Sequence, residues 1–152
     1  PPPAPALPGP QWRWAAPTAE RLAAHYKVVC DAMTPVPGSF IGTFDDFCAV
    51  TLDRDPPESL LLCGDHIAGF CRIHHGEGGL GYIDIIGRAP AFRGHGLGEI
   101  LLAHAMQRLA EGGATHFGLD VSAPNTTALA LYQRFGFAIT ATMPMYRRMI
   151  PG

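Results

Sequence analysis

The run Arg93-Gly94-His95-Gly96-Leu97-Gly98 has the composition of a loop that binds an anion. It lies between an apolar, strand-like segment and an amphipathic segment that predicts a helix. Three glycines allow the backbone to approach a ligand closely and to adopt unusual dihedral angles. The free N–H groups of the helix start, its dipole and the guanidinium of Arg93 then favour a diphosphate. A tight structural turn would use the same glycines and stays an alternative.

Two familiar nucleotide-binding loops do not fit this run. A Walker loop requires Gly-Lys followed by Ser or Thr, which is absent. A dinucleotide fingerprint requires its third glycine where Glu99 stands, and it begins directly after a strand. Here residues 88–92 separate Gly94 from the preceding strand. Asp120 stands about where a ribose-binding acid would lie, but no further strand–helix–strand units follow to complete such a domain.

Three other residues have side chains suited to acid–base or binding chemistry. Asp84 is the lone carboxylate in the apolar run of residues 82–86, where it could accept a proton or hold an ammonium group. It precedes Arg88 by four positions, so both side chains are expected on one face of a strand. Asn125 has the residue type of a helix N-cap. Tyr132, in the helix that follows, is either a buried aromatic residue or a proton donor.

Metal ligation, a membrane span and nucleic-acid binding are not predicted. The four cysteines form no CxxC pair, and His74-His75 lacks the spacing of helical zinc ligands. We interpret the cysteines as reduced thiols of a cytoplasmic protein. The apolar runs are too short to cross a bilayer, and the proline-rich start has no apolar core of a secretion signal. The formal net charge of −2 gives no general attraction to nucleic acid.

The elements that must position these residues form a mixed α/β sheet with one central crossover. Residues 1–11 are proline-rich and predict an extended arm or linker, and residues 12–152 predict a single domain. Hydrophobic periodicity and turn residues predict strands at 12–14, 59–63, 66–74, 82–86, 116–121, 137–141 and 145–150. They predict helices at 21–33, capped by Thr18, and at 45–52, 97–110 and 125–135.

Two linked blocks of sequence resemble the GNAT superfamily of N-acetyltransferases. The pattern Arg-x-x-Gly-x-Gly within residues 90–98, followed by Leu101-Leu102, is similar to motif A of that family. The second block is similar to the family's strand, asparagine, tyrosine and Gly-Phe signature, and contains residues 119–121, Asn125, Ala128, Leu131-Tyr132 and Gly136-Phe137. The resemblance is specific from about residue 82 to 150 and only topological before residue 59. It implies the GNAT fold, with splayed central strands in a mixed sheet of six to seven strands and about four flanking helices.

The resemblance implies that acetyl-CoA is the co-substrate and that no metal is needed. In this family the strand before the glycine loop is bulged and splays from the next strand, and the pantetheine arm lies in the gap. Arg88 departs from the usual apolar residue at its position, and Glu99 should turn away from the phosphates. The implied cofactor-binding residues are Ile86, Gly87, Arg88, Arg93, Gly94, His95, Gly96, Leu97, Gly98, Glu99, Asn125 and Tyr132.

The resemblance also implies catalytic roles. Tyr132 corresponds to the family's usual general acid, and Asp84 to a base found at this offset in polyamine-type members. Weaker rivals for the base are His74, His75, Glu77 and Asp45. The implied reaction is direct attack by a primary amine of a small molecule on the thioester in a ternary complex.

Several alternatives to that reaction stay open. They are acetylation of a protein N-terminus or lysine, a thiol or hydroxyl acceptor, and a non-catalytic acyl-CoA sensor domain. Asp31, Asp45 and Asp46 suit either a cationic acceptor or a solvated helix face. No nucleic-acid or membrane partner is expected. A homodimer and one part of a tandem GNAT chain, joined through the proline-rich start, are both open.

Overall fold

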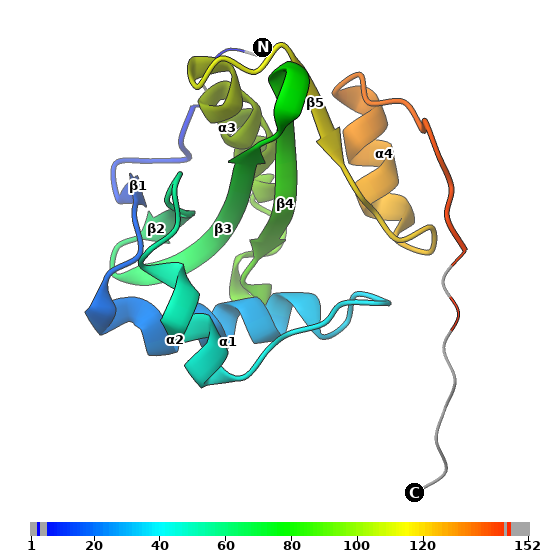
Figure 1. The fold of residues 1–152 in the computed structure, drawn as a ribbon. Helices are drawn as coiled ribbons and strands as arrows, with labels where there is room; N and C mark the ends of the chain where they lie inside the picture. The colour runs from blue at the N-terminus through cyan, green and yellow to red at the C-terminus, as the bar shows by residue number, and fades with distance from the viewer. Residues whose placement is uncertain (1–2, 4–5, 145, 147–152) are drawn as a thin grey trace, which may run out of the picture.

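The computed structural model describes residue 3, residues 6–144 and residue 146. Their strands form one sheet in the order β1-β2-β3-β4-β5, in which neighbours from β1 to β4 are antiparallel and β4 and β5 are parallel (Figure 1). The strands are β1 (Trp12–Ala15), β2 (Ser59–Cys63), β3 (His66–His75), β4 (Leu80–Arg88) and β5 (His116–Leu119). The helices are α1 (Leu22–Met33), α2 (Phe44–Thr51), α3 (Leu97–Glu111) and α4 (Thr126–Arg134). Short 3-10 turns are η1 (Ala19–Arg21), η2 (Glu77–Gly79) and η3 (Pro90–Phe92).

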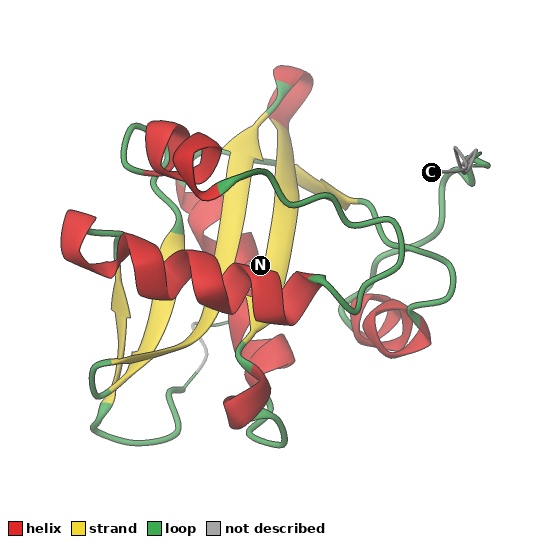
Figure 2. Cartoon of the chain, turned by 90° about the horizontal axis from the view of Figure 1, so that it is seen from below, coloured by secondary structure: helices red, strands yellow, loops and turns green. Residues whose placement is uncertain are grey.

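Helices cover both faces of the sheet, and Figure 2 shows α1 crossing in front of the strands. On the face covered by α1 and α2, Val29 and Phe47 pack against Leu60, Leu62 and Phe70. On the face covered by α3, the strands meet the apolar side of that helix, in two clusters that include Leu61, Ala68, Cys71, Ile73, Ile83, Leu97, Leu101, Leu102, Ala105, Met106 and Leu109. We call these the α1 face and the α3 face. Because the core strands have apolar side chains on both faces, they appear in the sequence as continuous apolar runs.

Strand β4 contains one extra residue opposite β3. Arg72 pairs with Ile85 and Ile73 pairs with Ile83, so Asp84 lies in a β-bulge between them. The bulge shifts the alternation of β4 by one position. Ile83 and Ile86 therefore both pack on the α3 face, whereas Ile85 packs on the α1 face.

The bulge makes the prediction that Asp84 and Arg88 share one face wrong. Arg88 pairs with Gly69, where a Cβ would lie 2.9 Å from Leu101 Cδ1 of α3, so this pair is on the α3 face. Asp84 instead contacts His74, which points to the α1 face because its neighbour Ile73 packs against α3. The period of two on which the prediction rested holds only within an uninterrupted strand.

Strands β4 and β5 are paired over only part of their length. The parallel register joins Leu80–Ile83 to His116–Leu119 and ends there. From Asp84 to Arg88, the edge of β4 that faces β5 has no strand partner among the described residues, and Figure 1 shows β5 leaning away from β4 toward α4. The splayed central strands expected from the family are therefore present, and the bulge of β4 lies at Asp84.

Most predicted elements are confirmed to within a few residues, but two expectations are wrong. Thr18 makes no side-chain capping hydrogen bond among the described residues, and the turn η1 separates it from α1, whose N-cap position is Arg21. Residues 137–141 form no strand: Ile139 is 67 % exposed and pairs with no strand of the described sheet. Their predicted partner, residues 145–150, lies outside the described residues apart from Tyr146. The described sheet thus has five strands instead of six or seven. Across the described residues, no helix is both long and apolar enough to span a bilayer.

Candidate functional site

The glycine loop between β4 and α3 is held in place from both sides. The N–H of buried Ala89 donates to Ala68 O of β3 at 2.8 Å. Phe92 packs edge-on against Trp12 of β1, with ring centroids 5.7 Å apart. His95 Nδ1 donates to Phe92 O at 3.1 Å and its ring lies against Trp12. Strands β1 and β3 therefore fix the loop at the start of α3.

The loop leaves an open cradle at this helix start. Gly94 and Gly96 have φ of +82° and +68°, in the region that favours glycine. A Cβ at either position would meet no atom within 4 Å, so the space beside the backbone is open. Within the described part of the chain, no side chain caps α3 or accepts from its first N–H groups. Together with the helix dipole and the exposed Arg93, this geometry fits a diphosphate.

The first turn of α3 joins the cradle to α4. Leu97 is fully buried beneath it. A Cβ at Gly98 would lie 3.1 Å from Leu131 Cδ2 of α4, so glycine allows close packing of the two helices. Glu99 forms an ion pair with Arg134, which turns its carboxylate toward α4.

The unpaired edge of β4 is the second part of the site. Ile86 packs into the α3-face core, and Gly87 lies over the ring of fully buried Phe70. Arg88 is exposed at the strand end on the α3 face, the side that carries the cradle. Free N–H and C=O groups along a strand edge need partners. The amides of a pantetheine arm fit this requirement.

Helix α4 holds the two remaining residues of the predicted set. Asn125 Oδ1 accepts from Ala128 N at 3.3 Å, which confirms it as the N-cap. Tyr132 packs against the α3-face core, 6.1 Å from the ring of Phe137. Its hydroxyl makes no hydrogen bond with the described residues, and burial raises its pKa.

A carboxylate–imidazole pair lies on the opposite, α1 face. Asp84 Oδ1 and His74 Nδ1 are 2.8 Å apart, which leaves His74 Nε2 free of this contact. The ring of Tyr82 lies 5.2 Å from that of His74. Burial, and then a hydrogen bond with Asp120, raises the pKa of Tyr82 to about 12. From the sequence, His74 and Asp84 are alternative candidates for the base. In the structure their side chains are in contact.

The other acidic and histidine candidates have structural explanations or lie elsewhere. Asp46 forms a capping box with Thr43 at the start of α2. Asp31 pairs with Lys27 one helical turn away. His75 lies against Gly112 at the far end of α3, where a Cβ on the glycine would be 2.3 Å from His75 Nε2. Glu77 belongs to η2 and Asp45 to the exposed first turn of α2. Within the part of the chain that the structure describes, no cluster of three or more His, Cys, Asp or Glu residues could hold a metal ion.

The sequence is similar to a known enzyme family along most of its length. Residues 12–137 match the family described as "Acetyltransferase (GNAT) family". The chain therefore belongs to this family, as its motifs predict.

Individual relatives agree with this assignment. The chain is 31 % identical over 100 residues to the mycothiol acetyltransferase of Corynebacterium efficiens, in a match that covers 66 % of this chain and 34 % of the relative. It therefore spans about a third of the length of that relative. The structure is similar to a GCN5-related N-acetyltransferase from Sphaerobacter thermophilus, with a TM-score of 0.70, 26 % identity and coverage of 90 % of this chain and 44 % of the other. The ribosomal-protein-S18-alanine N-acetyltransferase of Escherichia coli has the same fold, with a TM-score of 0.70, 22 % identity and coverage of 86 % and 79 %.

Proposed function

We propose that this chain transfers an acetyl group from acetyl-CoA to a primary amine of a small molecule, by direct attack in a ternary complex. The observation that carries the proposal is the split between β4 and β5. The open glycine loop at residues 94–96 lies on the α3 face beside this split, and the Asp84–His74 pair lies on the α1 face. A small acceptor is favoured because relatives of at least 30 % identity are mycothiol acetyltransferases, whose name gives a small molecule.

The donor is held by backbone more than by side chains. The amides from Gly94 to Glu99 bind the diphosphate, with Arg93 and Arg88 supplying positive charge on the same side. The unpaired edge of β4, from Ile86 to Arg88, binds the pantetheine arm. Bound in this way, acetyl-CoA presents an activated thioester at the split. Placing donor and acceptor side by side accounts for much of the rate acceleration.

The acceptor must lose a proton before it attacks. An alkyl amine with a pKa near ~10 is mostly protonated at neutral pH and has no free electron pair. Asp84 takes this proton, either directly or through the free Nε2 of His74. The nitrogen then forms a bond to the acetyl carbon and releases its second proton to solvent. A backbone N–H near Arg88 stabilises the developing oxyanion.

Tyr132 assists the departing thiolate as general acid. Burial raises its pKa, so the phenol is protonated at neutral pH. A thiol near ~8.5 is more acidic than a phenol near ~10, so complete transfer is uphill by about 2 kcal/mol. Tyr132 therefore shares its proton with sulfur while the C–S bond breaks. The proton stays on the phenol, and solvent protonates the departing thiolate.

Release of free CoA thiol from acetyl-CoA tests the proposal, with polyamines, amino acids, aminoglycosides and peptides as acceptors and calorimetric binding of acetyl-CoA alongside. Thiol release that depends on a small amine would support the proposal. Release with peptides alone would assign a protein acceptor. Binding of acetyl-CoA without turnover would assign a sensor domain, and absence of binding would contradict the donor site.

A further inference from the structure

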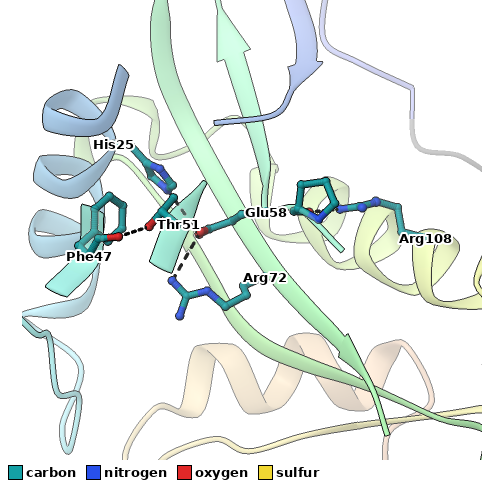
Figure 3. A network of polar contacts seen from close by, with 7 residues as sticks. His25, Phe47, Thr51, Glu58, Arg72 and Arg108 are labelled. Carbon is teal, nitrogen blue, oxygen red and sulfur yellow. Dashed lines mark hydrogen bonds and ion pairs between the residues drawn. The ribbon is translucent and has the colours of Figure 1, made fainter. Parts of the chain in front are cut away.

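A fully buried carboxylate lies beside the α1 face of the sheet. Glu58, directly before β2, has a side chain that is 0 % exposed. Its Oε1 is 3.4 Å from His25 Nε2 of α1, and its Oε2 is 3.5 Å from Arg72 Nη2 of β3 (Figure 3). Neither oxygen has a hydrogen-bond partner among the described residues. A buried charge costs several kcal/mol unless it is paired. Arg72 is the permanently charged partner of Glu58, so the ion pair between them compensates the burial of the carboxylate.

Arg72 extends from this buried carboxylate to the surface. Its side chain is 21 % exposed, and its Nε is buried without a described partner. It lies two residues before His74 on β3 and pairs with Ile85 on β4, next to the bulged Asp84. Because residues two apart on a strand share a face, Arg72 and His74 point to the same side of the sheet. The guanidinium is therefore on the face where the proposed acceptor amine is bound.

A second guanidinium belongs to the same group of charges. Arg54 lies between α2 and β2, and its Nε is buried without a hydrogen-bond partner in the described part of the chain. Arg54 forms no ion pair with a described carboxylate, whereas Arg72 forms one with Glu58. Burial lowers the pKa of Arg54, the charge of Arg72 lowers it further, and Glu58 and Asp84 act in the opposite direction. Arg54 follows α2 directly, and α2 covers the α1 face, so its unpaired guanidinium adds positive charge on the same side of the sheet as the Arg72–Glu58 pair.

We infer that Arg54 and Arg72 bind an oxyanion carried by the acceptor, while Asp84 and His74 take its amine. The inference rests on the proposed function and narrows its substrate to molecules that carry both a primary amine and a carboxylate or phosphate. A guanidinium presents its N–H donors as a fork that matches either group with two parallel hydrogen bonds. Glu58 acts through Arg72 as a positioning residue.

Matched acceptor pairs test this selectivity. The pairs are alanine and ethylamine, phenylalanine and phenethylamine, and O-phosphoethanolamine and ethanolamine, each compared by kcat/KM for thiol release. We expect at least about a tenfold preference for the anionic member of one pair, the size of effect that one charge-assisted contact gives. The preferred pair distinguishes carboxylate from phosphate. No preference in any pair would overturn the inference while leaving the proposed function intact.

Variants identify the residues responsible. Arg54→Gln, which breaks no described ion pair, should abolish the preference through KM of the anionic member. Arg13→Gln removes one exposed arginine from β1 and should preserve it. Glu58→Gln should raise KM for the anionic member only, whereas a purely structural role would lower the melting temperature and affect both members alike. A preference that survives Arg54→Gln unchanged would refute the assignment.

Product binding separates this inference from the proposed function. N-Acetylphenylalanine and N-acetylphenethylamine differ only in the carboxylate, and their calorimetric binding needs no turnover. If no amine supports thiol release, the proposed function fails, but tighter binding of N-acetylphenylalanine that is lost in Arg54→Gln would still support the anion site. Equal binding of the two products, together with no preference in the pairs, would contradict it.

Discussion

Replacing Tyr132 by phenylalanine should remove catalysis and leave the donor site intact. The ring packs against the α3-face core near Phe137, and the hydroxyl makes no hydrogen bond with the described residues. Loss of the oxygen therefore disturbs neither packing nor a hydrogen bond of the folded chain. General-acid catalysis contributes about 10²–10⁴-fold. We expect kcat to fall by about 10²–10³-fold, or about 3–4 kcal/mol of activation free energy, with the Kd for acetyl-CoA within about twofold of the wild-type value.

The assay is free-thiol release at saturating amine, with calorimetry of acetyl-CoA for each variant. Because burial raises the pKa of Tyr132 above its ordinary value of 10.0, the phenol stays protonated across the working range. The wild-type kcat should therefore show no alkaline loss below about pH 10. Tyr146→Phe is the control, because this tyrosine is 94 % exposed. Equal losses of kcat and acetyl-CoA affinity in Tyr132→Phe, or no loss of either, would refute the role of general acid.

Three further predictions follow from the same geometry. Asp84→Asn should lower kcat/KM for the amine by about 10²-fold at neutral pH, while calorimetry finds acetyl-CoA binding unchanged; an unaltered kcat/KM would remove Asp84 from the mechanism. Gly87→Ala should cost about 1–3 kcal/mol of unfolding free energy in urea, because its Cβ would lie 2.3 Å from Cζ of the fully buried Phe70; wild-type stability would show that the ring moves freely. Burial and then Arg108 lower the pKa of His104 from 6.5 to about 4, so the unfolded chain binds a proton there before the folded chain does, and stability should fall as pH drops from about 6.5 to about 4. His104→Phe, which can keep the stacking on Trp14 at 3.6 Å, should flatten that part of the profile of urea midpoint against pH, and an unchanged slope would contradict this origin.

The proposed donor half of the site could be predicted from the sequence because its features are local. Glycines in one loop adopt positive φ, Asn125 caps the helix that it precedes, and Leu97 begins the apolar side of α3. Each feature depends on neighbours within a few residues. The α2 capping box was equally local and was missed, although Thr43 followed three positions later by Asp46 is its usual signature.

The acceptor half depends on contacts that no local pattern encodes. The bulge at Asp84 adds one residue without breaking the apolar run. Strict alternation therefore places Arg88 on the same face as Asp84, whereas the two lie on opposite faces. The buried charge cluster joins three separate parts of the chain: His25 of α1, Glu58 just before β2, and Arg72 of β3. These residues meet only because α1 packs on the sheet. The strand predicted at residues 137–141 has the right composition, but a strand also needs a partner for its hydrogen bonds.

Amide hydrogen exchange with and without acetyl-CoA tests the central claim most directly, because it reports where on the chain the donor binds. The account predicts that acetyl-CoA slows exchange in two segments separated in sequence, residues 94–99 at the start of α3 and residues 86–88 on the unpaired edge of β4. Protection confined to other elements, or binding without protection of the β4 edge, would contradict a donor site in the split between β4 and β5.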